Sequence, residues 1–141
     1  MNPAKEIPTG TFEAHKNTEA PKMGAGKFKI KLSINGIEFG WMGRNNDGWC
    51  VLTNESPLVL EYYPYGGKMY YKVSEEDKYL SVSNSAYVGC YGWWGATTFR
   101  KEGKYLISDY NNQYLSLYSV DNKYLYAWDA YTKLEVEFVN V

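Results

Sequence analysis

The sequence predicts an all-β protein built from three similar units, with little or no helix. The first observation is that glycine-lysine pairs followed by an apolar or aromatic residue recur at steps of 41 and 36 residues: Gly26-Lys27-Phe28, Gly67-Lys68-Met69 and Gly103-Lys104-Tyr105. The second is that each pair opens a segment of short alternating strands and polar turns, without a capped period of 3.6 residues. Because a unit this small cannot bury its own apolar face, the three units are expected to share one core.

These repeats set the expected domain organisation. At 141 residues, the chain has the size of one domain. The first part is rich in proline, glycine and polar residues, which predicts a flexible arm with at most one short strand near Thr11-Phe12. We therefore expect an N-terminal arm at 1–25 and one β domain at 26–141, divided into repeats 26–66, 67–102 and 103–141.

The first repeat carries the clearest strand signal. Phe28, Ile30 and Leu32 alternate with lysines, which predicts a half-buried strand. Asn35-Gly36 follows, the pair that a type I′ hairpin turn requires because both central residues need positive φ. A turn at 44–48 then precedes strands at 49–52 and 58–63.

The later repeats follow the same order. Repeat two predicts strands at 69–73, 80–82 and 87–94 and closes at 97–99, whereas repeat three predicts strands at 105–107, 115–117, 124–126 and 136–138. The second strand of each repeat shows an apolar-polar-apolar triplet 11, 13 or 12 residues after its opening glycine: Ile37-Glu38-Phe39, Leu80-Ser81-Val82 and Leu115-Ser116-Leu117. Because a slip of one residue would turn these side chains outward, the shared phase predicts that all three triplets are buried together.

Two of these segments resemble a known family. Lys78-Tyr79-Leu80-Ser81-Val82 followed by Phe99, and Gln113-Tyr114-Leu115-Ser116-Leu117 followed by Phe138, are similar to repeats of fascin-like and lectin-like β-trefoil proteins. Repeat one departs from this pattern, and the Gln-x-Trp signature of ricin-type lectins is absent. The resemblance spans residues 26–141 and implies a six-stranded barrel capped by three hairpins.

Composition and charge exclude several classes of function. A net charge of −1 with scattered lysines and arginines argues against nucleic acid and against a polybasic membrane surface. No stretch is long and apolar enough to span a membrane, and the first residues lack the apolar core of a signal peptide. We therefore expect no membrane insertion, and a protein that is cytoplasmic, released without a recognisable signal, or supplied as a mature fragment.

Catalytic and metal chemistry are not expected. His15 is the only histidine and falls in the proposed arm, so a nucleophile would lack a positioned base. Two cysteines and one histidine are too few for a zinc site, and no phosphate-binding glycine loop precedes a helix. Cys50 and Cys90 fall on the third strands of repeats one and two, which favours two buried free thiols over a bridge, although both remain open. We predict no enzyme activity, no metal and no cofactor.

Aromatic side chains beside Asn or Asp point to a binding function. The chain has 15 Tyr and 5 Trp. A sugar offers apolar C–H faces that stack on a ring and hydroxyls that need planar donors and acceptors, so this combination is the minimal carbohydrate site. Adjacent Trp93 and Trp94 would face opposite sides of a strand, so at least one ring needs cover other than the core. The candidate residues are Asp47, Trp49 and Asn54 in repeat one, Trp94 in repeat two, and Asn122, Tyr126, Trp128 and Asp129 in repeat three.

We therefore expect a carbohydrate-binding, lectin-like module with up to three shallow sites and a glycan as ligand. One alternative is a protein-binding trefoil, either a fascin-like cytoskeletal partner using Lys27, Lys29 and Lys31, or a protease inhibitor presenting one loop. Another alternative is the receptor-binding component of a toxin. The Asn and Asp residues can also serve simply as turn formers, and the Trp residues as plugs of the barrel ends.

Overall fold

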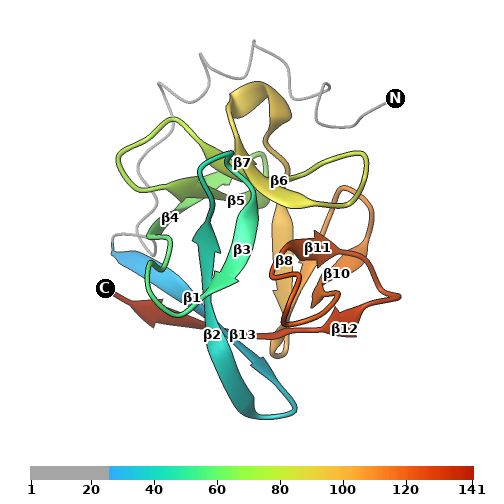
Figure 1. Ribbon diagram of the computed structural model, residues 1–141. Coiled ribbons are helices and arrows are strands. Elements are labelled where there is room, and N and C mark those ends of the chain that lie inside the picture. The colour runs from blue at the N-terminus through green and yellow to red at the C-terminus, as the bar shows by residue number, and fades with distance from the viewer. Residues whose placement is uncertain (1–25) are drawn as a thin grey trace.

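The protein is an all-β structure, seen in a computed structural model that describes residues 26–141 (Figure 1). The predicted arm, with His15 and the short strand near Thr11, lies outside the described residues. The strands are β1 (Lys27–Ile34), β2 (Ile37–Arg44), β3 (Cys50–Thr53), β4 (Leu60–Tyr65), β5 (Lys68–Val73), β6 (Tyr79–Val82), β7 (Val88–Tyr91), β8 (Phe99–Glu102), β9 (Tyr105–Ser108), β10 (Gln113–Leu117), β11 (Leu125–Ala127), β12 (Thr132–Lys133) and β13 (Glu135–Asn140). A single 3₁₀ turn, η2 (Trp93–Gly95), is the only helical element of 26–141.

Six strands form a nearly closed antiparallel sheet. β1 pairs with both β13 and β4, β4 pairs with β5, and β9 pairs with both β8 and β13. β5 and β8 lie side by side, which brings the two ends of this path together. Closure of this kind leaves few free strand edges.

Among residues 26–141 no helical stretch has the length and apolar character that crossing a bilayer takes.

Three further hairpins, β2–β3, β6–β7 and β10–β11, meet one another (Figure 1). Each pair of hairpins is joined by one antiparallel bridge: Trp49 with Gly89, Val51 with Tyr124, and Tyr87 with Tyr126. Each pair also shares one backbone hydrogen bond of 2.8 Å: Cys90 N–H to the carbonyl of Gly48, Leu52 N–H to that of Lys123, and Ala127 N–H to that of Ala86. The three accepting residues all have positive φ, of 91°, 70° and 70° for Gly48, Ala86 and Lys123.

The core lies inside the six strands and under these hairpins. Phe28, Ile30 and Leu32 are fully buried, as their alternation with lysines predicted. The Asn35-Gly36 turn is also confirmed, because its two residues have φ of 50° and 81°. In repeats two and three the predicted inward residues are buried at or below 2 % exposure: Leu80, Val82, Leu115 and Leu117.

The matching prediction for repeat one is wrong for Ile37, whereas Phe39 is half-buried and packs against the core. Ile37 is 64 % exposed, because it opens β2 at the end of a hairpin that projects beyond the nearly closed sheet (Figure 1). The register with β1 then shifts: Leu32 lies opposite Gly40 but Ser33 lies opposite Glu38, so Phe39 is an extra, bulged residue. A bulge reverses the inward-outward alternation. Met42, opposite Leu52, is the large side chain of β2 that is fully buried in the core.

The Trp93-Trp94 pair also differs from the expected strand. β7 ends at Tyr91, and both tryptophans lie in the turn η2. Trp93 is 5 % exposed and packs with Tyr70, Tyr79 and Ala96 in a second apolar cluster, whereas Trp94 is 53 % exposed. The expectation that only one ring enters the core therefore holds, through turn geometry rather than strand alternation.

Candidate functional site

An aromatic pocket lies where the β6–β7 hairpin meets the β10–β11 hairpin. It has a volume of about 270 Å³ and is lined by residues 84–87, Tyr126, Trp128 and Tyr131. We refer to this set as the aromatic pocket. Small-molecule pockets usually run from about 300 to 1,000 Å³, so this one suits a ligand the size of a single sugar ring.

The turn at 83–87 forms one wall of the aromatic pocket. The hydroxyl of Ser83 accepts hydrogen bonds from the N–H groups of Ser85 and Tyr87, both at 3.2 Å. Ala86 adopts a φ of 70° at the point where its carbonyl receives the N–H of Ala127. The turn is thus tied both to itself and to β11, which fixes the wall relative to Tyr126.

The opposite wall comes from β11 and the turn after it. Tyr126 lies on β11 opposite Ser116 of β10. The hydroxyl of Ser116 is buried and donates to the carbonyl of Trp128 at 2.8 Å. The N–H of Tyr131 also donates to the Trp128 carbonyl, at 3.2 Å. These bonds hold the backbone under Trp128 while its indole ring stays 44 % exposed.

Aromatic rings continue beyond the pocket in a contiguous row. Ring centroids are 4.7 Å apart for Tyr87 and Tyr126, 5.0 Å for Tyr126 and Tyr131, and 5.0 Å for Tyr131 and Tyr118. Tyr118, at the end of the row, is 61 % exposed. Such tilted and edge-on pairs stabilise one another, so the rings form a preorganised surface.

Polar groups border these rings. The side-chain oxygen of Asn84 accepts a hydrogen bond from the Tyr110 hydroxyl at 2.6 Å. No acceptor for the Asn84 amide hydrogens is found within residues 26–141, so they are available to donate. Desolvation raises the pKa of Tyr126 to about 12, so its phenol remains a neutral hydrogen-bonding group at physiological pH.

The other two predicted residues of repeat three hold backbone N–H groups. Asn122 accepts the N–H of Tyr124 at 2.9 Å, and its side chain also hydrogen-bonds the Tyr126 phenol. Asp129 accepts the N–H of Tyr114 at 2.8 Å, and its own N–H donates to the Gln113 side chain. Both residues shape the turns that carry Tyr126 and Trp128, and neither lines the aromatic pocket.

The predicted residues of repeat one are not brought together. Trp49 packs against Tyr87 and Tyr91, with ring centroids 5.5 and 5.8 Å away, where the hairpins meet. Asp47 instead lines a separate pocket, described below, whose lining contains neither Trp49 nor Asn54. Asn54 is exposed beyond the end of β3. In repeat two, Trp94 stands exposed on η2, away from the lining of the aromatic pocket.

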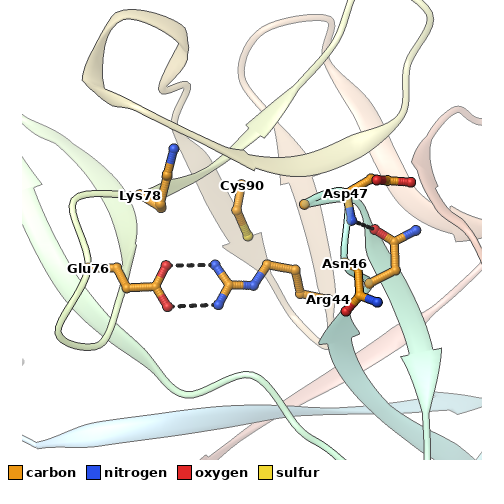
Figure 2. Close-up of a pocket in the computed structure, with 8 residues that line it drawn as sticks. Arg44, Asn46, Asp47, Glu76, Lys78 and Cys90 are labelled. Carbon is orange, nitrogen blue, oxygen red and sulfur yellow. Dashed lines mark hydrogen bonds and ion pairs between the residues drawn. The ribbon is translucent and has the colours of Figure 1, made fainter.

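A polar pocket of about 500 Å³ lies beside the β2–β3 turn (Figure 2). It is lined by Arg44, residues 45–48, Glu76, Lys78 and Cys90. Arg44 donates to both carboxylate oxygens of Glu76, at 2.9 and 2.7 Å. The same pair lowers the pKa of Glu76 and raises that of Arg44.

The lining of the polar pocket contains two cationic side chains, Arg44 and Lys78, and two acidic ones, Asp47 and Glu76, so its formal charges balance. Cys90 supplies its only sulfur. Within 26–141, no three His, Cys, Asp or Glu residues group as metal ligands would.

Sequence reasoning did not select Asn84, Tyr87 or Tyr131 as site residues. Asn84 and Tyr87 reach Tyr126 and Trp128 only because the β6–β7 and β10–β11 hairpins meet, and no local spacing encodes that contact. Tyr131 lies three residues after Trp128 and contacts it through the local turn. The chain matches no protein-family model, no curated protein and no solved structure in the comparisons made with each.

Proposed function

We propose that this chain is a β-trefoil carbohydrate-binding module, with its site in the aromatic pocket. Support for the trefoil comes from the three hairpins: each pair of them shares one bridge and one 2.8 Å hydrogen bond, and each hairpin carries one residue of positive φ at the meeting point. The pairing of β1, β4, β5, β8, β9 and β13 supports a barrel beneath them. Fold alone does not imply function, so the site has to carry the second half of the proposal.

The observation that carries the carbohydrate proposal is the exposed Trp128 ring beside Tyr126, Tyr131 and the free amide of Asn84. A pyranose would stack one C–H face on the indole and receive hydrogen bonds from the amide. Tyr118 extends the row of rings, and a second sugar residue would lie there. A half-exposed indole costs free energy in water, and covering it on binding recovers that cost.

One site is proposed rather than three. In repeat one, the Trp49 ring packs against Tyr87 where two hairpins meet. In repeat two, Trp94 is not among the residues that line the aromatic pocket. The lysines that would favour an acidic protein filament already have neighbours. Lys29 and Lys31 lie 5.4 and 5.3 Å from the centre of the Trp41 ring, and Lys31 pairs with Glu38 at 3.4 Å.

The proposal predicts that Trp128→Ala weakens saccharide binding at least about tenfold, which corresponds to roughly 1.4 kcal/mol. A glycan array would identify binders, and titration of tryptophan fluorescence with the best of them would give the affinity. The melting temperature should stay within about two degrees of the parent, because the ring is half exposed and the backbone bonds beneath it are retained.

Trp94→Ala is the matched control, since it removes a tryptophan of similar exposure, 53 % against 44 % for Trp128, that does not line the pocket. Its affinity for the saccharide should equal that of the parent. An unchanged affinity in Trp128→Ala, or an equal loss in both variants, would contradict the proposed site. Binding of a protein with no response to any saccharide would replace it by the protein-binding alternative.

A further inference from the structure

Two free thiols from different hairpins touch beneath the polar pocket. Cys50 of β3 and Cys90 of β7 are both buried, and their Sγ atoms are 3.9 Å apart. The hydrogen bond from Cys90 N–H to the Gly48 carbonyl holds the two strands side by side. The sulfur atoms are therefore kept in contact by the backbone, not by flexible side chains.

The two cysteines occupy positions that are apolar and buried where the other hairpins meet. We call the place where two hairpins meet a junction. At each junction one backbone N–H donates the hydrogen bond between the hairpins, and the donors are Cys90, Leu52 and Ala127. The residue two positions before each donor is also equivalent among the hairpins. These residues are Cys50 before Leu52, Val88 before Cys90 and Leu125 before Ala127. The corresponding residues at the other junctions are thus all apolar and buried. Only the junction next to the polar pocket carries sulfur.

Cys90 is also reachable. It lines the polar pocket, and Figure 2 shows its sulfur on the side of the Arg44 guanidinium. The hydrogen bond between the two sulfur atoms, with the positive charge of Arg44, lowers the pKa of the Cys90 thiol. The same hydrogen bond and full burial raise the pKa of Cys50. One thiol therefore resembles an attacking nucleophile and the other a protonated resolving partner.

We propose that Cys50 and Cys90 form a dithiol–disulfide couple that is oxidised through the polar pocket by small zwitterionic disulfides of the glutathione class. The pocket offers Lys78 to a carboxylate of such a molecule and Asp47 to its ammonium group, while Arg44 and Glu76 stay paired with each other. The proposal is independent of sugar binding, because the two pockets share no residue.

The chemistry balances as two exchanges. The Cys90 thiolate attacks one sulfur of the small disulfide, which breaks the S–S bond, forms a mixed disulfide and releases one thiolate that takes up a proton. Cys50 then loses its proton and attacks the Cys90 sulfur, which releases the second small thiol. The net reaction oxidises two protein thiols to one disulfide and reduces one small disulfide to two thiols.

The test is mass spectrometry of the full chain incubated with oxidised glutathione. We expect loss of two hydrogens, a peptide map that links Cys50 to Cys90, and a melting temperature several degrees higher because the link closes a long loop. Reduction with dithiothreitol should reverse both changes. Cys50→Val should stop at a mixed disulfide on Cys90, and Cys90→Ala should gain no glutathione.

These variants copy the apolar residues at the equivalent junctions, Val88 and Ala127, so they are expected to fold, and circular dichroism checks this. A wild-type chain that keeps both thiols across a range of glutathione potentials would overturn the proposal, whatever the variants do. Disulfides that form only between molecules would also overturn it.

Discussion

Trp93→Ala is expected to lower the free energy of unfolding by about 3–5 kcal/mol, the usual cost of truncating a buried tryptophan. The ring is 5 % exposed and has four tyrosine neighbours, Tyr63, Tyr65, Tyr70 and Tyr79, at centroid distances from 4.7 to 6.1 Å. Removing it leaves a cavity that fixed strands β4 and β5 cannot close. Urea denaturation followed by far-ultraviolet circular dichroism measures the change.

The neighbouring tryptophan supplies the control. Trp94→Ala should change the free energy of unfolding by no more than about 0.5 kcal/mol, because half of its ring already faces water. If Trp93→Ala does not fold, Trp93→Phe keeps the comparison usable, with a smaller expected loss. Equal losses of unfolding free energy at the two positions would mean that the turn η2 does not bury Trp93 and expose Trp94.

Met42→Ala is expected to cost about 2–5 kcal/mol of unfolding free energy, the range for large-to-small changes in a core. Met42 is fully buried opposite Leu52, at the place in β2 that Leu80 and Leu115 take in β6 and β10. Leu80→Ala and Leu115→Ala should fall in the same range. Denaturant titration of the three variants tests whether the hairpins share one core.

Ile37→Ala is the matched change on the same strand and should cost at most about 0.5 kcal/mol, since Ile37 is 64 % exposed. The sequence pattern alone predicted the reverse, with Ile37 buried. A loss of unfolding free energy at Ile37 as large as that at Met42 would contradict the small cost expected here. It would mean that inward and outward side chains alternate without interruption along β2 and that the bulge at Phe39 is absent.

Much of the strand pattern could be predicted from local sequence. Alternation of apolar and lysine residues located β1, and Asn35-Gly36 located its turn, because both signals depend only on neighbours in the chain. The bulge at Phe39 gave no such signal. It depends on how β2 pairs with β1, and one extra residue was enough to place Met42 in the core in place of the expected Ile37.

The candidate site was predictable in part for a related reason. Trp128 and Tyr126 carry an aromatic signature that residue type alone reveals, and both line the aromatic pocket. Asn122 and Asp129 share the residue types of sugar ligands, but they also fit turns, and here their oxygens accept backbone N–H groups. Asn84 of repeat two has the residue type of a sugar ligand and lies near aromatic residues in the sequence, but only the meeting of two hairpins places it beside Trp128.

The most direct measurement is the mapping of backbone amide shifts by NMR as the best-binding saccharide from the array is added. Saccharide recognition by the aromatic pocket predicts that the shifted amides cluster at 84–87 and 126–131, together with the indole N–H of Trp128. A panel in which no saccharide binds, or shifts that cluster at 44–48 and leave Trp128 unmoved, would contradict it.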